Sequence, residues 1–410
     1  MAIARAHRYK HQQPPWGRWR FSAETLPRSW FFWFSALVSC IAIYIMAAVP
    51  FVSVDLLALA TNPSYFSTLP ATSGVEPAVS LLSYHDSFKD LLGPNATAKL
   101  IGNYSHQAFH EGGVYNKETN TMIISSNYDV GPPPDNINIT ILSLDDWSIQ
   151  STAYPDLWNA NGGTSYYPPG SNTSAPPRHQ VWADEGDLEH PSSLVSVDVA
   201  NNKTEVILNS FLGGRNFSSI NDVRQHSQTG DIWFTDADYG WFQYFRPEAT
   251  VPKQVYRFEP GTGVIQVVAD GFVEPNGLEF SPDEKTLYVT DSGAAQWMQF
   301  NYTRPSTVYA YDIIDNKRLA NRRTFAFADN GVPDGIHADT EGNLWVANGD
   351  GVHVWNPEGI LIGKIYIGET SNNFAFIPGG VLVFTNNRLW LVSGIKAQGR
   401  EICKDFGVGC

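Results

Sequence analysis

The sequence predicts an all-β domain folded as a six-bladed β-propeller, preceded by an apolar segment long enough to form a transmembrane helix or signal anchor. A short pattern of strand, turn and strand recurs roughly every 40–50 residues, which is typical of propeller blades. Between residues 100 and 400 no segment sustains a helical period. The chain has 410 residues, of which 43% are hydrophobic, enough for a large folded core.

The repeat is clearest in Pro275–Asp291. An Asn-Gly turn opens a short strand, a polar turn around Pro282-Asp283 follows, and β-branched and aromatic residues form a second strand. The same pattern returns in Pro333–Ala347 and, with more variation, elsewhere. Each repeat begins with a polar residue at the mouth of a strand. Six such residues predict six blades: Glu111, Asn161, Asn221, Asn276, Asp334 and Asn373.

The N-terminal region differs in composition from the repeats. Residues 1–29 hold six Lys and Arg residues and one Glu, and we interpret them as a basic cytosolic tail. Residues 30–52 are predicted to be a transmembrane signal anchor, because about 20 apolar residues span a bilayer and the basic flank stays in the cytosol. A signal peptide is the alternative, since Ala58-Leu59-Ala60 resembles a small-x-small cleavage site.

The remaining boundaries follow from the repeats. Residues 53–100 are predicted as a stem and ring-closing segment, 101–402 as the propeller and 403–410 as a C-terminal tail. Cys403 and Cys410 could form a disulfide in an oxidising compartment, although free thiols remain an alternative. The net charge is −14 and the folded part has no long basic cluster, which argues against a nucleic-acid partner. We expect a monomer.

Either interpretation of the N-terminus sends the propeller into the secretory pathway. It would be the lumenal or extracellular part of a single-pass type II membrane protein, or it would be secreted. Asn-x-Ser/Thr triplets agree with this location because they are acceptors for N-glycosylation. Seven such triplets begin at Asn95, Asn103, Asn138, Asn172, Asn202, Asn216 and Asn301.

The mouth residues predict a metal site. The innermost strand of each blade starts at the central channel, so side chains at equivalent positions converge there. Glu111, Asn221, Asn276 and Asp334 would supply two carboxylates and two amide oxygens, a set that suits a hard cation such as Ca²⁺. Asn-Gly and Asp-Gly are also common turn residues, so a purely structural role stays open for each position.

The motifs around these residues resemble the SMP-30/gluconolactonase/LRE family, and most closely its fungal lactonohydrolase branch, over residues 105–395. The motifs in question are Glu111–Tyr115, Asn221–Val223, Pro275–Leu278 and Pro333–Ile336. The resemblance implies a six-bladed propeller with one divalent cation, usually calcium, held in the central channel by the four mouth residues. The first motif departs from the family pattern, because it reads Glu-Gly-Gly where many relatives have Glu-Gly-Pro.

The resemblance also implies an enzyme that opens a lactone or a related ester with the cation as Lewis acid. It points to Asp334 as the base that activates water, or as a ligand only. His337 and His110 are alternatives, because imidazole titrates near neutral pH. Asn161, Asp222 and Tyr239 are predicted to contact the small-molecule substrate.

Aromatic residues near the mouths favour a larger or more apolar substrate than a simple sugar lactone, although they could equally pack in the core. They are Trp158, Tyr166, Tyr167, Tyr239, Trp241 and Phe242. Two other functions remain open. One is a non-hydrolytic cyclase or condensing enzyme of secondary metabolism, similar to strictosidine synthase-like proteins, with a structural metal. The other is a noncatalytic binding propeller, which would have no evident need for acidic residues in its channel.

Overall fold

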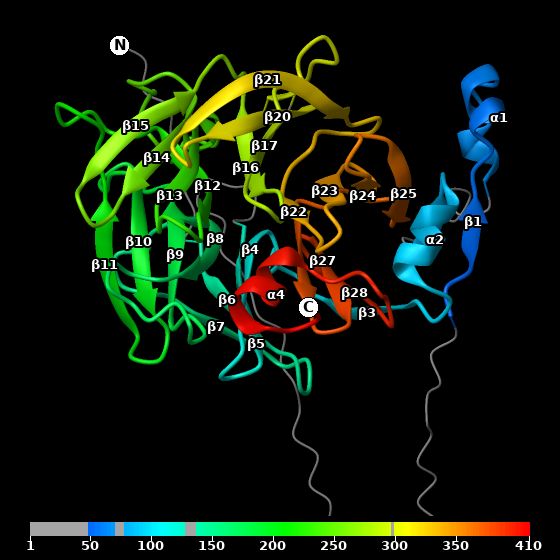
Figure 1. Ribbon diagram of the computed structural model, residues 1–410, viewed down its shortest axis with the longest axis horizontal. Helices are drawn as coiled ribbons and strands as arrows, with labels where there is room; N and C mark the ends of the chain where they lie inside the picture. Colours follow the sequence, from blue (N-terminus) through cyan, green and yellow to red (C-terminus); the bar gives the residue numbers. More distant parts are fainter. Residues whose placement is uncertain (1–47, 70–77, 128–136, 297–298) are drawn as a thin grey trace, which may run out of the picture. The chain divides into compact units, whose positions relative to one another are not determined.

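The computed structural model describes residues 48–69, 78–127, 137–296 and 299–410. Apart from one two-stranded sheet, these residues form six β-sheets, or blades, whose strands are almost all antiparallel (Figure 1). The innermost strand of each blade contacts the innermost strand of the next, and the last contacts the first, which closes a ring. The prediction of an all-β, six-bladed propeller is therefore confirmed.

Blades one to three each consist of four strands in sequence order. Blade one contains β4 (Glu111–Asn116), β5 (Thr121–Ser125), β6 (Ile139–Ser143) and β7 (Ile149–Thr152). Blade two contains β8 (Ala160–Tyr166), β9 (His179–Asp184), β10 (Ser193–Asp198) and β11 (Lys203–Leu208). Blade three contains β12 (Ser219–Gln225), β13 (Ile232–Ala237), β14 (Gln254–Glu259) and β15 (Val264–Ala269), with the short helix α3 (Tyr239–Phe242) after β13.

Blades four to six carry additions. Blade four contains β16 (Pro275–Phe280), β17 (Thr286–Asp291), β20 (Thr307–Ile314) and β21 (Arg318–Phe327), with the small hairpin β18 (Ala295–Gln296) and β19 (Gln299–Phe300) between β17 and β20. Blade five contains β22 (Ile336–Ala338), β23 (Leu344–Asn348), β24 (Gly351–Trp355) and β25 (Leu361–Tyr366). Blade six contains β26 (Asn373–Ile377), β27 (Gly380–Thr385), β28 (Arg388–Ser393) and β3 (Thr97–Asn103).

The N-terminal part of the described chain closes the ring. Strand β3 pairs antiparallel with β28, so a strand that begins in the predicted ring-closing segment 53–100 and runs to Asn103 completes blade six. We predicted the rest of that segment as a stem, but its described residues form short helices and strands. It forms β1 (Phe51–Ser53), α1 (Leu56–Thr61), the 3₁₀-helix η1 (Phe66–Thr68), β2 (Ser80–Ser83) and α2 (Asp86–Leu92), and β2 extends blade five by pairing with β25.

The predicted transmembrane segment lies mostly outside the described residues. Its C-terminal end is the exception, because Phe51 begins strand β1 and pairs with Leu81 of β2. A helix therefore does not continue to residue 52, which corrects that boundary. Within the described ranges, no helix is long and apolar enough to cross a membrane.

An aspartate at the end of the second strand fixes the mouth of blades two, three and four. Asp184 accepts hydrogen bonds from the Trp158 and Asn159 backbone N–H groups at 3.0 and 2.7 Å. Asp236 and Asp291 accept equivalent bonds from the chain just before β12 and β16. Because buried N–H groups need acceptors, each aspartate holds the connection that leads into its innermost strand.

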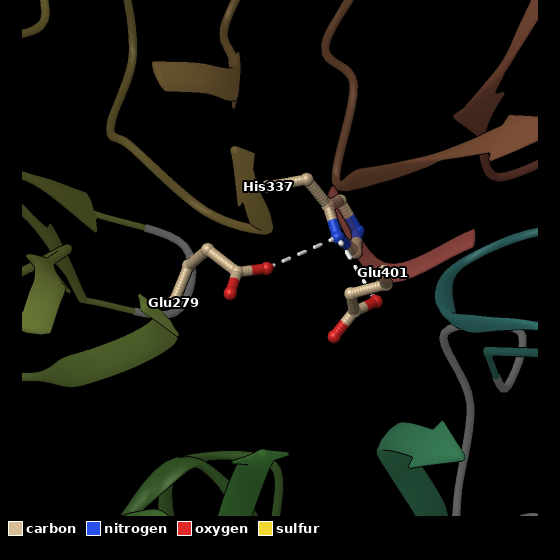
Figure 2. Close-up of side chains that lie close together, drawn as sticks. All are labelled: Glu279, His337 and Glu401. Carbon is tan, nitrogen blue, oxygen red and sulfur yellow. Dashed lines mark ion pairs between the residues drawn. The ribbon is translucent and has the colours of Figure 1, made fainter. Parts of the chain in front are cut away.

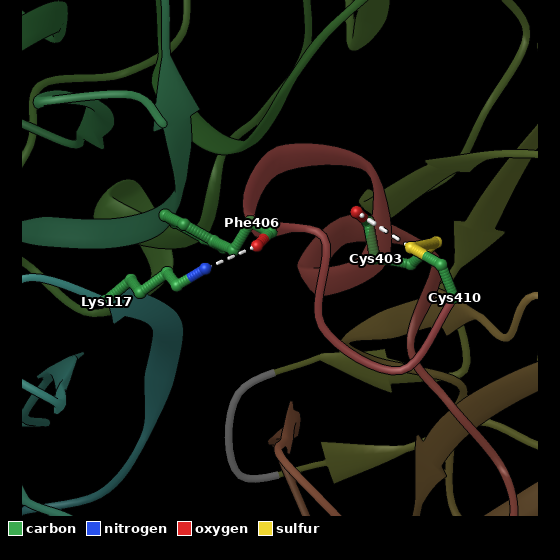
Figure 3. Close-up of a disulfide and its surroundings, with 4 residues drawn as sticks. All are labelled: Lys117, Cys403, Phe406 and Cys410. Carbon is green, nitrogen blue, oxygen red and sulfur yellow. Dashed lines mark hydrogen bonds between the residues drawn. A yellow bond between two sulfur atoms is a disulfide. The ribbon is translucent and has the colours of Figure 1, made fainter. Parts of the chain in front are cut away.

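Part of the predicted C-terminal tail, residues 403–410, is helical. Helix α4 (Arg400–Phe406) begins before them and contacts β22. Figure 3 shows a disulfide between Cys403 and Cys410, whose Cα atoms are 5.1 Å apart, which is the first of the two alternatives for this pair. Lys117 donates a hydrogen bond to the Phe406 carbonyl oxygen at 2.8 Å, which fastens the end of the helix to blade one.

The asparagines of the seven Asn-x-Ser/Thr triplets all lie on the surface. Each is exposed to solvent, including those next to buried strands. An oligosaccharide could therefore be attached at every one of these positions without opening the core. The seven residues are Asn95, Asn103, Asn138, Asn172, Asn202, Asn216 and Asn301.

Candidate metal centre and active site

A cavity of about 320 Å³ lies where the innermost strands begin. The four residues predicted as metal ligands all line it, although they come from four different blades. Two of the three predicted substrate contacts, Asn161 and Tyr239, also line it. We call the predicted ligands the mouth cluster: Glu111, Asn221, Asn276 and Asp334.

Irregularities in the innermost strands aim these side chains into the cavity. The pairing register shifts within β4, β8, β12 and β16, in each case beside the mouth residue. Such a bulge adds one residue to a strand and turns the local side chains. In β4 the bulge contains Gly112 and Gly113, with φ of 78° and 89°. Proline cannot adopt a positive φ, so the Glu-Gly-Gly motif has a backbone that Glu-Gly-Pro could not have.

Side-chain amides donate to both carboxylates of the mouth cluster. Asn373 Nδ2 donates to Glu111 Oε2 at 2.7 Å, and Asn372 Nδ2 donates to Asp334 Oδ2 at 3.3 Å. Burial raises the pKa of Glu111 well above its usual value, and the nearby Asp334 raises it further. Burial also raises the pKa of Asp334 to about 7. The pair is therefore poorly compensated by the protein itself.

Amide oxygens around the same cavity have no donor. Asn221 Oδ1 and Asn161 Oδ1 are buried and have no hydrogen-bond partner among the described residues. The Asn161 amide is held by Glu185, since its Nδ2 donates to Glu185 Oε1 at 2.8 Å. Asn276 Nδ2 donates to the Tyr239 hydroxyl at 3.1 Å. Buried acceptors without donors are costly, and a hard cation would satisfy them. The residues present therefore fit a Ca²⁺-type site.

His110 lines the same cavity, at the position just before β4. Its Nδ1 lies 2.8 Å from Asn386 Oδ1. An amide oxygen only accepts, so Nδ1 carries the proton and Nε2 keeps its lone pair. Burial lowers the pKa of His110 to about 4. The ring is therefore neutral at neutral pH and can accept a proton.

His337 does not line the mouth cavity, which corrects its prediction as a catalytic residue. Figure 2 shows its ring between two carboxylates, with Nδ1 at 3.7 Å from Glu279 Oε2 and 3.6 Å from Glu401 Oε2. Burial would lower the pKa of His337, but these carboxylates outweigh it and raise the pKa to about 9. The ring also borders a hollow of only about 20 Å³ beside α4, room for about one water molecule.

Asp222 is likewise not a substrate contact. It is absent from the cavity lining, and its carboxylate accepts hydrogen bonds from the Val223 and Leu278 backbone N–H groups at 2.8 and 3.1 Å. Arg224 Nη1 lies 2.9 Å from the same carboxylate. The bond from Leu278 ties β12 to β16, the other two contacts lie within β12, and together they leave Asp222 with a structural role.

Asp222 and His337 belong to a charged set within the channel. Arg224 Nε lies 3.0 Å from Glu401 Oε1 and 3.5 Å from Glu279 Oε2. Arg400 Nη1 lies 3.1 Å from Glu279 Oε1. Glu279, His337 and Glu401 have the atoms to bind a metal, but the two guanidinium groups already compensate the carboxylates. We call this set the channel network: Asp222, Arg224, Glu279, His337, Arg400 and Glu401.

The predicted aromatic residues are only partly at the cavity. Tyr239 and Phe242 line it. Trp158 stacks on His190 with ring centroids 3.6 Å apart, and Tyr166 is buried in the core between blades two and three. Tyr167 borders a separate hollow, and Trp241 is exposed. Of the six predicted aromatic residues, only Tyr239 and Phe242 line the cavity.

Several residues of the site were not predicted. Glu185 holds Asn161, Asn373 holds Glu111, and Asn372 holds Asp334. The signal for Asn372 and Asn373 was present, because they form the sixth mouth. Glu185 follows the aspartate that ends β9, and nothing in its local sequence distinguishes it from a turn residue.

Comparisons with known proteins agree with this geometry. A family model described as the SMP-30/Gluconolactonase/LRE-like region matches residues 187–385. Lactonohydrolase oryL of Aspergillus oryzae is 32% identical over 330 residues, which are 75% of this chain and 72% of that protein. The gluconolactonase of Zymomonas mobilis is 29% identical over 233 residues, 53% of this chain and 60% of that protein.

Among solved structures, a gluconolactonase from Xanthomonas campestris has the same fold. Its TM-score is 0.62 at 23% identity, covering 80% of this chain and 98% of that one. The mouth residues, their order along the blades and the likeness to the Aspergillus protein together assign the family. The chain belongs to the SMP-30/gluconolactonase/LRE-like family and resembles its fungal lactonohydrolase branch.

Proposed function

We propose that the protein is a calcium-dependent hydrolase that opens a lactone, or a related ester, in the mouth cavity. The observation that carries the proposal is the convergence of two carboxylates and several amide oxygens without donors on one cavity. The names of the relatives, lactonohydrolase and gluconolactonase, support lactones as the substrate class.

The mouth cluster would hold the cation. Its ligands are all oxygens, two of them charged, which favours Ca²⁺ over metals that prefer thiolate or imidazole. When bound, the cation supplies a Lewis acid that polarises the lactone carbonyl. Asn161 and Tyr239 lie on the same cavity and would orient the substrate.

His110 is the residue we propose to take the proton from the attacking water. It is neutral, it lines the cavity, and Asn386 fixes the tautomer whose lone pair is on Nε2. The water oxygen adds to the carbonyl carbon and the ring C–O bond breaks. The proton is then returned to the alkoxide, so the product is a hydroxy acid. Asp334 remains the alternative base, with a weaker case if it binds the cation.

We also propose that the propeller acts in the secretory pathway, anchored by the N-terminal segment or secreted. The exposed asparagines of the seven Asn-x-Ser/Thr triplets and the disulfide in α4 support this location. Digestion of the native protein with an endoglycosidase should lower its apparent mass. An unchanged mass would count against a lumenal or extracellular domain.

The proposed activity is tested with the full chain and a panel of aliphatic, sugar and aromatic lactones. Turnover should vanish with a calcium chelator and return when Ca²⁺ is added back. Glu111→Gln should lose calcium binding and turnover together, whereas Glu205→Gln, an exposed acid on β11, should lose neither. Turnover that survives complete calcium removal would refute calcium dependence. A folded, calcium-loaded protein without turnover would favour the non-hydrolytic cyclase.

A further inference from the structure

The lining of the mouth cavity has two chemically different sides. The apolar residues come from connections in blades three and four and from the chain that enters blade five. Of the polar residues beyond the mouth cluster, four come from the chain that enters blades six and one and from blade one itself, and four others come from blades two to four: Asn161, Tyr239, Gln243 and Ser292. The apolar set is Phe242, Ala295, Phe300 and Val332. The polar set is His110, Asn127, Thr370 and Asn372.

Three consecutive connections place the apolar side. Phe242 ends helix α3 after β13, Ala295 and Phe300 belong to the hairpin β18 and β19, and Val332 precedes β22. Blades three, four and five are consecutive in the ring, so these connections lie on one side of the cavity, where Gln243 and Ser292 also line it. We call Phe242, Ala295, Phe300 and Val332 the apolar wall.

The apolar wall is not packed away in the core. Phe300 is 40% exposed, and Phe242, Ala295 and Val332 are half-buried. Their free surface faces a cavity whose opposite side is polar. A ligand that covers this apolar surface binds more tightly, because water leaves both the cavity wall and the ligand.

We infer that the substrate is a lactone that carries an apolar substituent of several carbon atoms. The inference rests on the proposed function and names the substrate class of that same site. The carbonyl would face the mouth cluster, and the substituent would lie on the apolar wall. A polyhydroxylated sugar lactone fits this arrangement poorly, because hydroxyls placed against the wall would lose water without gaining a partner.

The size of the preference follows from the area covered. Full burial of one methylene group favours binding about fourfold. Because the wall stays partly open to solvent, we expect kcat/KM to rise about two- to fourfold for each methylene added to the substituent. The rise should stop when the substituent outgrows the cavity.

The experiment uses calcium-loaded full chain and γ-lactones whose side chain grows from hydrogen to hexyl, with gluconolactone for comparison. Wild type should show the rise in kcat/KM with chain length. The double variant Phe242→Ser, Phe300→Ser should flatten it. Phe327→Ser replaces an exposed phenylalanine outside the cavity lining and should leave the rise unchanged.

A second measurement separates this inference from the proposed activity. Binding of γ-lactams with the same side chains reports on the wall without turnover. Tighter binding with chain length that is lost in the double variant supports the wall even if no lactone is hydrolysed, in which case the proposed activity fails alone. Equal binding of all lactams, or gluconolactone turned over as well as the hexyl lactone, would overturn the inference while leaving lactone hydrolysis intact.

Discussion

The mouth cluster and the channel network lie on the same innermost strands, yet their acids are balanced in different ways. Asn221 and Arg224 are three residues apart on β12, as are Asn276 and Glu279 on β16. A separation of three residues along a strand is about 10 Å. The bulge between the two positions lets both side chains face the channel, where a regular strand would turn one of them away.

The difference lies in the cations. Among the described residues that line the mouth cavity, none is a lysine or an arginine. In the channel network, two guanidinium groups and a protonated imidazole lie against the carboxylates. Buried charges need partners. The network is therefore compensated within the chain, whereas the mouth cluster has no such cation among the described residues, which is why we propose one from solution.

Replacing Arg224, the arginine that contacts three acids of the channel network, should have the largest effect on stability. Arg224→Met leaves the buried Asp222 and Glu279 and the partly buried Glu401 without their shared partner. Breaking a buried ion pair in this way costs about 3–5 kcal/mol. We expect the free energy of unfolding, measured with urea, to fall by that amount.

The matched control is Arg323→Met. Arg323 pairs with Asp312 at 2.8 Å, but both side chains are close to half exposed. Exposed pairs contribute about 0–1 kcal/mol. If the two variants lost equal stability, the channel network would not be the compensated site that its contacts indicate.

The protonated His337 gives the channel network a pH dependence. Its pKa is about 9 in the folded protein and about 6.5 in an unfolded chain. A raised pKa stabilises the fold below pH 6.5, and this stabilisation is lost as the pH rises through 9. The total is up to about 3 kcal/mol.

Unfolding of wild type and His337→Gln from pH 6 to pH 9.5 measures this contribution. The difference in free energy between them should shrink as the pH rises. His106→Gln, which changes an exposed histidine, should show no such trend. A difference that stays constant with pH would mean that His337 is not protonated in the fold.

The mouth cluster was predictable from sequence and the channel network was not. Glu111, Asn221, Asn276 and Asp334 stand beside turn residues at equivalent points of a repeat, so the fold class alone brings them together. The role of Asp222 could not be read in this way, because the bulge at Asn221 decides which of two adjacent polar residues faces the cavity.

The role of α4 could not be predicted from sequence, because it depends on contacts between distant parts of the chain. Glu401 pairs with Arg224 across 177 positions of sequence, and no local pattern marks either residue. His337 was assigned to the mouth because it follows Asp334 closely. His337 is three positions after Asp334, and at that distance along the chain its ring already lies beside Glu279 instead of the mouth cavity.

A change of acid to amide distinguishes the two sites most directly, because the sign of its effect on stability should reverse between them. In calcium-free protein, Asp334→Asn removes a carboxylate whose pKa is raised to about 7. The carboxyl ionises more easily in the unfolded chain than in the folded protein, so the folded state loses stability as the pH rises from about 4 to 7. The variant should therefore be more stable than wild type by up to about 4 kcal/mol at pH 8 and equal to it near pH 4.

The same change of acid to amide in the channel network should destabilise. Glu279 accepts from Arg400 at 3.1 Å and from the Phe280 N–H at 2.7 Å, and Arg224 lies at 3.5 Å. Glu279→Gln would leave both guanidinium groups short of a counter-charge. The test is to measure the free energy of unfolding of Asp334→Asn and Glu279→Gln in the presence of a calcium chelator. If Asp334→Asn also lost stability, the protein itself would already compensate the mouth cluster, and the case for a cation there would weaken.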